Sequence, residues 1–119
     1  MTETMTPETR TATEARDVTG PVTLINCFVV PEDRDEAFQR LWTEASTYFR
    51  ARPGYVSLRL HRAVTPGAAY RWVNVARWES QADYLAAHAT DEFRRLVTQE
   101  SWQEFPNVPT LYEVVMADG

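Results

Sequence analysis

The sequence predicts an α+β fold in which a four-stranded antiparallel sheet carries its helices on one face, the ferredoxin-like split βαβ arrangement. Two observations lead to this prediction. The chain has 119 residues, of which 44% are hydrophobic and 24% charged, which suits one globular domain and is too short for two. Its apolar segments also follow the order strand, helix, strand, strand, helix pair, strand when they are assigned by their periodicity.

The first strand and helix are predicted by residues 22–53. The run VTLINCFVV at 22–30 is apolar and rich in β-branched residues, and Pro31 closes it as a strand. Asp33, followed three residues later by Glu36, resembles a capping box and predicts a helix that continues to about residue 51. Its buried stripe has helical spacing: Phe38, Leu41, Trp42, Ala45 and Phe49.

The next two strands are predicted to form a hairpin. Residues 55–62 (YVSLRLHR) follow the Arg-Pro-Gly stop of the helix and alternate between apolar and polar side chains, as a strand with one buried face does. A loose turn at Pro66 and Gly67 returns the chain into a third strand at residues 70–78 (YRWVNVARW).

The last part of the domain is predicted to hold two short helices and one strand. Ser80 and Thr90 are suited to cap the two helices, because a side-chain oxygen at the N-cap accepts a bond from a free backbone N–H. Residues 101–109 contain two prolines and are predicted to form a loop, and residues 110–116 (TLYEVVM) to form the final strand.

A polar segment precedes this domain. Residues 1–20 are rich in threonine and charged residues and hold almost no large apolar side chain, so they are expected to be a disordered tail. The domain is therefore expected to occupy residues 21–119.

The predicted sheet leaves one face without helices. We expect an apolar row on the second strand, Val56, Leu58 and Leu60, and a pair on the third, Val73 and Val75, to lie on that face. A second copy of the chain packed on it, giving a homodimeric α+β barrel, is the expected cover. A monomer covered by its own tail is the alternative, which the polarity of the tail disfavours.

Composition excludes several classes of function. The net charge of −5 and the scattered arginines argue against a nucleic-acid partner, and the absence of a long apolar run or a signal-peptide pattern indicates a cytoplasmic protein away from membranes. One cysteine, Cys27, and two histidines are too few for a metal site. Without lysine or a nucleotide-binding glycine motif, neither Schiff-base chemistry nor a nucleotide cofactor is expected.

Two asparagines inside apolar strands are the main candidates for a functional site. Asn26 and Asn74 each need a partner, because an unpaired buried amide costs about 1–3 kcal/mol. One such residue is more often a satisfied structural amide, but two on matching strands with a tryptophan favour a ligand site. Strand alternation places these residues with apolar neighbours on the same face: Leu24, Phe28, Trp72 and Trp78.

The chain also resembles the antibiotic biosynthesis monooxygenase family over about residues 22–97. The segments VTLINCFVV, FRARPGY and YRWVNVARWES carry the resemblance, and the pattern is most similar to the small cofactor-independent anthrone oxygenases of aromatic polyketide pathways. This resemblance implies Asn26, Asn74 and Trp78 as catalytic residues, with Tyr84 in contact with the substrate. It also implies a dimeric barrel, O₂ as co-substrate and no flavin, haem or metal.

Other branches of this family match less well. The resemblance places Ala87 and Val97 where haem-degrading members carry Trp and His, so haem degradation is not expected. His88 lies about one position from the histidine that many members carry on this helix, and it is interpreted as a pocket-edge residue more than as a base. The helical arginine of the family is not aligned with certainty, which leaves Arg94 and Arg95 as guesses.

The expected function is the oxidation of an anthrone-like polyketide intermediate to a quinone through a stabilised enolate. Asn26 and Asn74 would bind the ketone or enolate oxygen, and Trp78 would stack on the rings or donate to them. The base is either unnecessary, because the substrate is acidic, or a pocket-edge histidine. Two other functions remain open: a polyketide cyclase or isomerase that consumes no O₂, and a binding protein whose asparagines pair with backbone.

Overall fold

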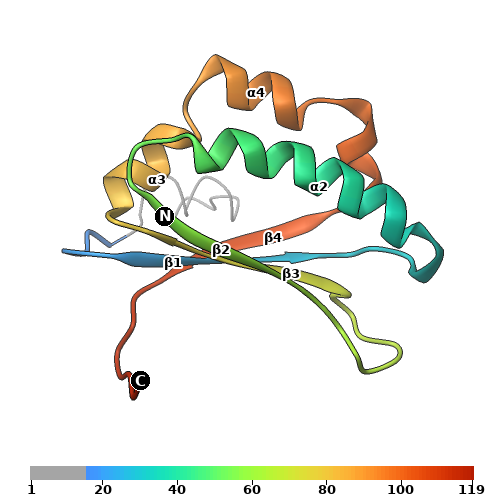
Figure 1. Ribbon diagram of the computed structural model, residues 1–119, viewed down its shortest axis with the longest axis horizontal. Helices are drawn as coiled ribbons and strands as arrows, with labels where there is room; N and C mark the ends of the chain where they lie inside the picture. Colours follow the sequence, from blue (N-terminus) through green and yellow to red (C-terminus); the bar gives the residue numbers. More distant parts are fainter. Residues whose placement is uncertain (1–15) are drawn as a thin grey trace, which may run out of the picture.

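The computed structural model describes residues 16–119 and has the predicted α+β fold. One four-stranded antiparallel sheet has the strand order β2-β3-β1-β4, and α2, α3 and α4 all lie on the same side of it (Figure 1). The elements follow in this order: β1 (Val22–Phe28), η1 (Glu32–Arg34), α2 (Asp35–Arg50), β2 (Tyr55–Arg62), β3 (Trp72–Trp78), α3 (Gln81–Ala87), α4 (Asp91–Val97), η2 (Glu100–Glu104) and β4 (Asn107–Tyr112).

The apolar core between sheet and helices has two clusters. One is centred on Phe38 of α2, which is fully buried, and the other on Trp78 of β3, which is 2% exposed. The first cluster contains Phe28, Val30, Phe38, Trp42, Trp72 and Phe105. The second contains Val22, Leu24, Ala76, Trp78 and Ala87. Burial of these side chains supplies most of the driving force for folding.

Both predicted helix caps in the second half of the chain are confirmed. The Ser80 hydroxyl accepts a hydrogen bond of 3.0 Å from the Asp83 amide, and the Thr90 hydroxyl accepts one of 3.0 Å from the Phe93 amide. These caps fix where α3 and α4 begin, and so they position the residues that these helices direct toward the sheet.

The capping box predicted at Asp33 is wrong. Asp33 lies in η1, α2 begins two residues later, and its N-cap residue makes no side-chain capping bond. The start of α2 is held instead by the Asp35 carboxylate, which accepts bonds of 2.9 and 2.8 Å from Arg71 and one of 2.8 Å from the Trp72 indole. A tertiary ion pair with Arg71, the residue before β3, therefore takes the place of the local cap.

This ion pair predicts a dependence of stability on acid. The hydrogen bonds from Arg71 are the main cause that lowers the pKa of Asp35 from 3.8 to about 2. Because the folded-state pKa is depressed, the stabilisation is complete above about pH 4 and is lost as the pH falls toward 2. Asp35→Asn is expected to lower the free energy of unfolding at pH 7 by about 1 kcal/mol, because solvent partly screens the ion pair, and to flatten this acid limb.

Urea unfolding at several pH values measures this effect, with Asp33→Asn on the exposed η1 as the matched control. An Asp35→Asn variant with the stability and acid limb of the wild type would contradict the role given to the ion pair.

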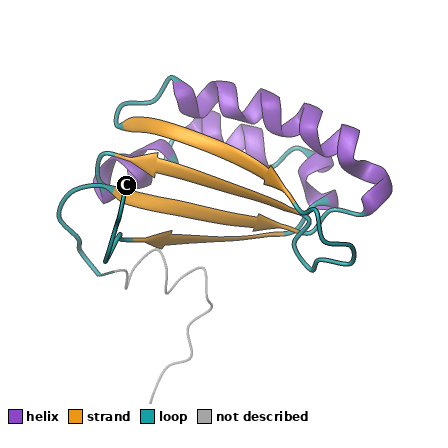
Figure 2. Ribbon diagram, turned by 60° about the horizontal axis from the view of Figure 1, so that its bottom comes forward, coloured by secondary structure: helices purple, strands orange, loops and turns teal. Residues whose placement is uncertain are grey.

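The residues on the uncovered face of the sheet differ from the predicted ones. A β-bulge between Tyr55 and Ser57 shifts the alternation of β2, so that Leu58 and Leu60 pack against the core clusters and Val56 is left 46% exposed. The pairing registers of the sheet place the apolar residues of the uncovered face mainly on the other strands. We call this set the outward patch: Ile25, Cys27, Val73, Val75 and Val108. Figure 2 shows this side of the sheet, with the helices behind it.

The final strand is shifted relative to the prediction. Residues 101–109 were expected to form a loop, but they include η2 and the first half of β4, which begins at Asn107 and ends at Tyr112 rather than Met116. Pro109 is tolerated there because β4 is an edge strand, which does not need a donor from every residue.

The segment expected to be disordered falls partly outside the described residues, which begin at 16. Residues 16–20 make specific contacts: the Arg16 guanidinium donates to Glu113 at 2.7 Å, and the Val18 amide donates to the Gln81 side chain at 3.1 Å. Val18 also packs on the Trp78 cluster. This part of the segment is thus attached to the domain.

Candidate active site

A cavity of about 250 Å³ lies between the sheet and the helices. All four strands line it, as do α2, α3, α4 and η2, and most of its lining is apolar. Seven of the eight residues predicted for the site line it: Leu24, Asn26, Phe28, Asn74, Trp78, Tyr84 and His88. The apolar lining with a few polar side chains is typical of a small-molecule site.

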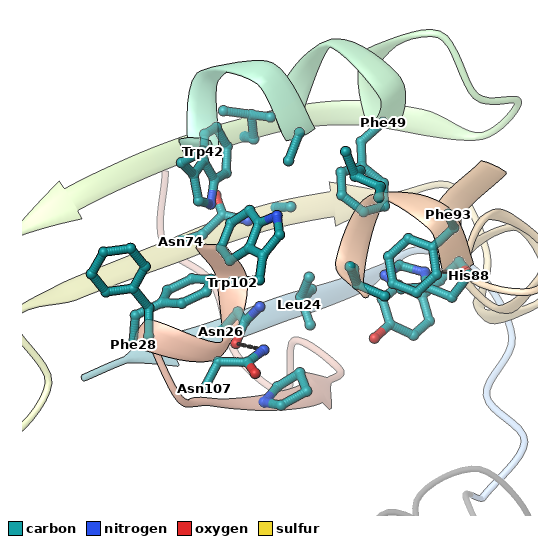
Figure 3. Close-up of a pocket in the computed structure, with 18 of the residues that line it drawn as sticks. Leu24, Asn26, Phe28, Trp42, Phe49, Asn74, His88, Phe93, Trp102 and Asn107 are labelled. Atoms are coloured by element: carbon teal, nitrogen blue, oxygen red, sulfur yellow. Dashed lines mark hydrogen bonds between the residues drawn. The ribbon is translucent and has the colours of Figure 1, made fainter. Parts of the chain in front are cut away.

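Three carboxamides meet at one end of the cavity. Asn26 of β1 and Asn74 of β3 are directly paired in the sheet, so both side chains leave the same face. Asn107, at the start of β4, donates a hydrogen bond of 3.0 Å from Nδ2 to Oδ1 of Asn26 (Figure 3). This bond holds the Asn26 oxygen toward Asn107 and leaves the Asn26 NH₂ group free to donate to a ligand.

Polar atoms without hydrogen-bond partners are concentrated at this cavity. Within residues 16–119, four enclosed side-chain atoms have none, and three belong to the lining: Oδ1 of Asn74, Nε1 of Trp78 and Nε1 of Trp102. Each unsatisfied atom costs about 1–3 kcal/mol, and such atoms are rare in native proteins. Three of the four unsatisfied atoms therefore belong to cavity-lining side chains, but all three are enclosed by neighbouring protein atoms, so a ligand reaches them only if these side chains rotate.

Aromatic rings enclose the other end of the cavity. The His88 ring lies 4.1 Å from Tyr84, 4.6 Å from Phe93 and 5.1 Å from Phe49, measured between ring centroids. Burial raises the pKa of Tyr84 to about 12, so its phenol stays protonated and is able to donate. Burial also lowers the pKa of His88, although the hydrogen bond to the Tyr84 carbonyl opposes this shift.

The eighth predicted residue, Trp72, lies outside the cavity lining. Its indole donates to Asp35 and its ring packs 5.1 Å from Phe38, so the ion pair at the start of α2 draws it into the core. Arg94 and Arg95 are also outside the lining: Arg94 bonds to Asp91 on the exposed side of α4.

His61 and Arg59 are on the face of β2 opposite the cavity. Both are exposed and pair in the sheet with Val73 and Val75, which belong to the outward patch. The structure therefore separates them from the candidate site.

Sequence reasoning missed the polar lining residues Trp102, Gln103 and Asn107, because all three fall in the segment predicted as a loop. The signal for Asn107 was a third asparagine next to an apolar stretch. Three aromatic residues were recognised only as members of buried helix stripes: Trp42 and Phe49 line the cavity from α2, and Phe93 lines it from α4.

Two further features are absent from residues 16–119. These residues contain no group of three or more His, Cys, Asp and Glu side chains that is arranged to hold a metal ion. Nor do they include a helix with the length and hydropathy needed to cross a bilayer.

Comparisons with known proteins agree with this architecture. The family model described as antibiotic biosynthesis monooxygenase matches residues 21–99. A protein from Shewanella loihica PV-4, described provisionally as a monooxygenase, is 35% identical with a TM-score of 0.72, and the match covers 84% of this chain and 99% of the other. No curated protein matches the chain.

More distant solved structures share the fold alone. SnoaB from Streptomyces nogalater, a cofactor-independent oxygenase, is 22% identical with a TM-score of 0.70, over 83% of this chain and 97% of the other. A heme-degrading protein from Mycobacterium tuberculosis is 21% identical with a TM-score of 0.61, over 83% of this chain and 99% of the other. One fold thus carries at least two chemistries among these neighbours.

Proposed function

This chain belongs to the antibiotic biosynthesis monooxygenase family, and on that premise we propose that it is a cofactor-independent monooxygenase that oxidises an anthrone-like aromatic polyketide to a quinone. The observation that carries the proposal is an apolar cavity whose lining holds the paired carboxamides of Asn26 and Asn74 together with the indole of Trp78. A flat apolar ligand with a few oxygen atoms at its rim suits such a lining.

The substrate supplies the reducing electrons in this chemistry. An anthrone has an acidic methylene conjugated to its ketone, and its enolate is electron-rich enough to pass an electron to O₂ directly. The protein has to favour the enolate, hold it against O₂ and exclude bulk water. Asn26 and Asn74 are the candidates to donate to the ketone or enolate oxygen, Trp78 to stack on the rings or donate to them, and Tyr84 to bond a peripheral oxygen.

An oxygen electrode tests the proposal. Purified protein, dialysed against a chelator and free of flavin and haem absorbance, is expected to consume O₂ with anthrone as the probe substrate and to form anthraquinone in equal amount. Conversion of a polyketide substrate without O₂ uptake would favour a cyclase or isomerase instead. Turnover that appears only after haem is added would also contradict the proposal.

A purely binding function is the remaining alternative. It would have Asn26 and Asn74 turned away from any cavity and bonded to backbone. Within the described residues both asparagines line the cavity, and neither side chain is bonded to a backbone group. This observation favours a role for the two amides toward a ligand.

A homodimer is part of the proposed functional state. The outward patch is apolar, and at the C-terminal end Val114, Val115 and Met116 are between 63% and 89% exposed. A second copy, packed face to face on the sheet, would cover the patch. Light scattering is expected to give twice the 13.7 kDa of one chain, and Val75→Asp within the patch is expected to shift the protein to monomer. A monomeric wild type would contradict this assembly.

Asn107 is predicted to act through Asn26. Asn107→Ala removes the bond to Oδ1 of Asn26 and is expected to lower kcat/KM about 2–10-fold, the value of one hydrogen bond. Asn107→Asp should be worse, since a carboxylate accepts from the Asn26 NH₂ group and turns the Asn26 oxygen toward the enolate.

Steady-state kinetics of the two Asn107 variants measures the difference between them. Val108→Thr, on the opposite face of β4, is the control for structural disturbance of the strand. Equal rates in both variants would show that the orientation of the Asn26 amide does not matter.

A further inference from the structure

His88 is the one titratable group at the aromatic end of the cavity whose ordinary pKa lies near neutrality. It follows the last turn of α3, and aromatic side chains from three other elements surround it: Phe49 of α2, Phe93 of α4 and Trp78 of β3. Figure 3 shows His88 beside Phe93, at the opposite end of the cavity from Asn26 and Asn107. The roles assigned above to Asn26, Asn74 and Trp78 do not use it.

The hydrogen bonds of His88 fix its tautomer. Nδ1 lies 2.8 Å from the carbonyl oxygen of Tyr84, which only accepts hydrogen bonds, so Nδ1 carries the proton. In the neutral ring, Nε2 then holds a free lone pair. Nε2 has no hydrogen-bond partner among the described residues. It is also not one of the enclosed atoms without a partner, so it is accessible from the space around it.

The surroundings of His88 keep the ring neutral. Tyr84 is the titratable residue in ring contact with it, and the raised pKa of Tyr84 keeps that phenol uncharged. The ion pair of α4, Arg94 with Asp91, is at the exposed start of that helix, where Arg94 also donates to the Ala89 carbonyl. Burial places the pKa of His88 below its ordinary value of 6.5, so at pH 7 the ring is an unprotonated base.

The cavity has two chemically different ends. Asn26 and Asn74 mark the carboxamide end, and Trp78, four residues further along β3, lies roughly 13 Å away at the His88 end. In an anthrone, the ketone oxygen and the acidic methylene are on opposite edges of the central ring. An anthrone that binds with its ketone at the amides and with the short axis of its ring system along the cavity directs its methylene toward the His88 end.

We propose that Nε2 of His88 is the base that removes the methylene proton of the substrate. The inference rests on the proposed function and identifies the base that the sequence leaves open. The methylene C–H bond breaks, its proton moves to Nε2, and its electron pair delocalises onto the ketone oxygen at the carboxamide end. His88 becomes an imidazolium whose Nδ1–H is still held by the Tyr84 carbonyl.

The remaining steps balance with O₂ as the oxidant. The enolate gives one electron to O₂, and the resulting radical and superoxide combine to form a peroxide anion at the former methylene carbon. The His88 imidazolium returns its proton to this anion. Loss of the second C–H proton with cleavage of the O–O bond gives the quinone carbonyl and one water, so that CH₂ and O₂ become C=O and H₂O.

Proton removal can be measured without oxygenation. Under anaerobic conditions in D₂O, the wild type is expected to exchange the methylene hydrogens of anthrone faster than buffer, as followed by NMR. The exchange rate should fall as the pH drops through the pKa of His88, below about 6.5, because protonated Nε2 is no longer a base. His88→Gln is expected to lower exchange and O₂ uptake about 10²–10⁴-fold and to abolish this pH limb.

A second variant and a matched control distinguish the loss of a base from misfolding of the variant. His88→Ala opens space for free imidazole, which is expected to restore part of the exchange rate, whereas a structural defect would not respond. The matched control is His61→Gln, the same substitution on the opposite face of the edge strand β2, and it is expected to exchange at the wild-type rate.

The possible outcomes separate the two proposals. If His88→Gln retains exchange within about threefold of the wild type, His88 is not the base, and the oxygenase function still stands. If the wild type exchanges the methylene hydrogens in a His88-dependent way but consumes no O₂, the base stands and the oxygenase function fails. A wild type that does neither overturns both.

Discussion

Asn74→Ala and Trp78→Phe are each expected to lose most of the O₂-consuming turnover while the protein remains folded. Removal of one donor that stabilises a developing oxyanion in a dry site typically costs about 10²–10³-fold in kcat. Asn74 is 7% exposed and its oxygen has no partner among the described residues, so its amide contributes little to folding. The melting temperature of Asn74→Ala is therefore expected to be equal to or higher than that of the wild type.

Trp78→Phe keeps an aromatic ring in the second core cluster but removes the indole N–H. Oxygen uptake and thermal unfolding, measured on the same samples, separate lost chemistry from lost structure. Arg77→Ala, at an exposed position on the opposite face of β3 and outside the outward patch, serves as the control for β3. Full turnover in both site variants would overturn the residue assignment, and a large drop in the melting temperature of Asn74→Ala would show that its amide is structural.

Phe38→Ala is expected to cause the largest loss of stability of any single truncation. Phe38 is fully buried, and its ring lies between 4.9 and 5.3 Å from the rings of Phe28, Trp72 and Phe105. Truncation of a buried phenylalanine costs about 3–5 kcal/mol, because transfer energy is lost and a cavity remains. For a domain of this size each kcal/mol corresponds to roughly 4–8 °C in Tm, so a fall of more than about 12 °C is expected.

Chemical denaturation gives the corresponding free energy of unfolding. Gln39→Ala, at the neighbouring but exposed position of α2, is expected to change it by less than about 0.5 kcal/mol. A loss below 1 kcal/mol in Phe38→Ala would mean that the first core cluster is not packed as described.

The sequence predicted the elements whose signals are local. Ser80 and Thr90 form the predicted caps. Gly54, with a φ of +83°, lies in the turn between α2 and β2. The alternation of β1 and β3 placed Asn26 and Asn74 on one face. Each of these signals depends on backbone geometry within a few residues, which the residue types determine directly.

Features that depend on distant contacts were not predictable. Asp35 is held by Arg71, far along the chain, and this tertiary pair both replaced the expected cap at Asp33 and removed Trp72 from the cavity. The bulge in β2 reversed the expected orientation of Leu58, because one extra residue changes which face each side chain occupies. Asn107 was not recognised as a site residue because the prolines around it favoured a loop, whereas β4 begins at Asn107.

The helices and the outward patch occupy opposite sides of one sheet, and the cavity is on the helical side. If two copies associate through their outward patches, their cavities lie back to back, with two layers of strands between them. Each copy then binds and releases its ligand without touching the ligand of the other. The dependence of the rate on substrate concentration should accordingly be hyperbolic, with a Hill coefficient near one. A mixed dimer of one active and one inactive chain should retain half the activity of the wild-type dimer.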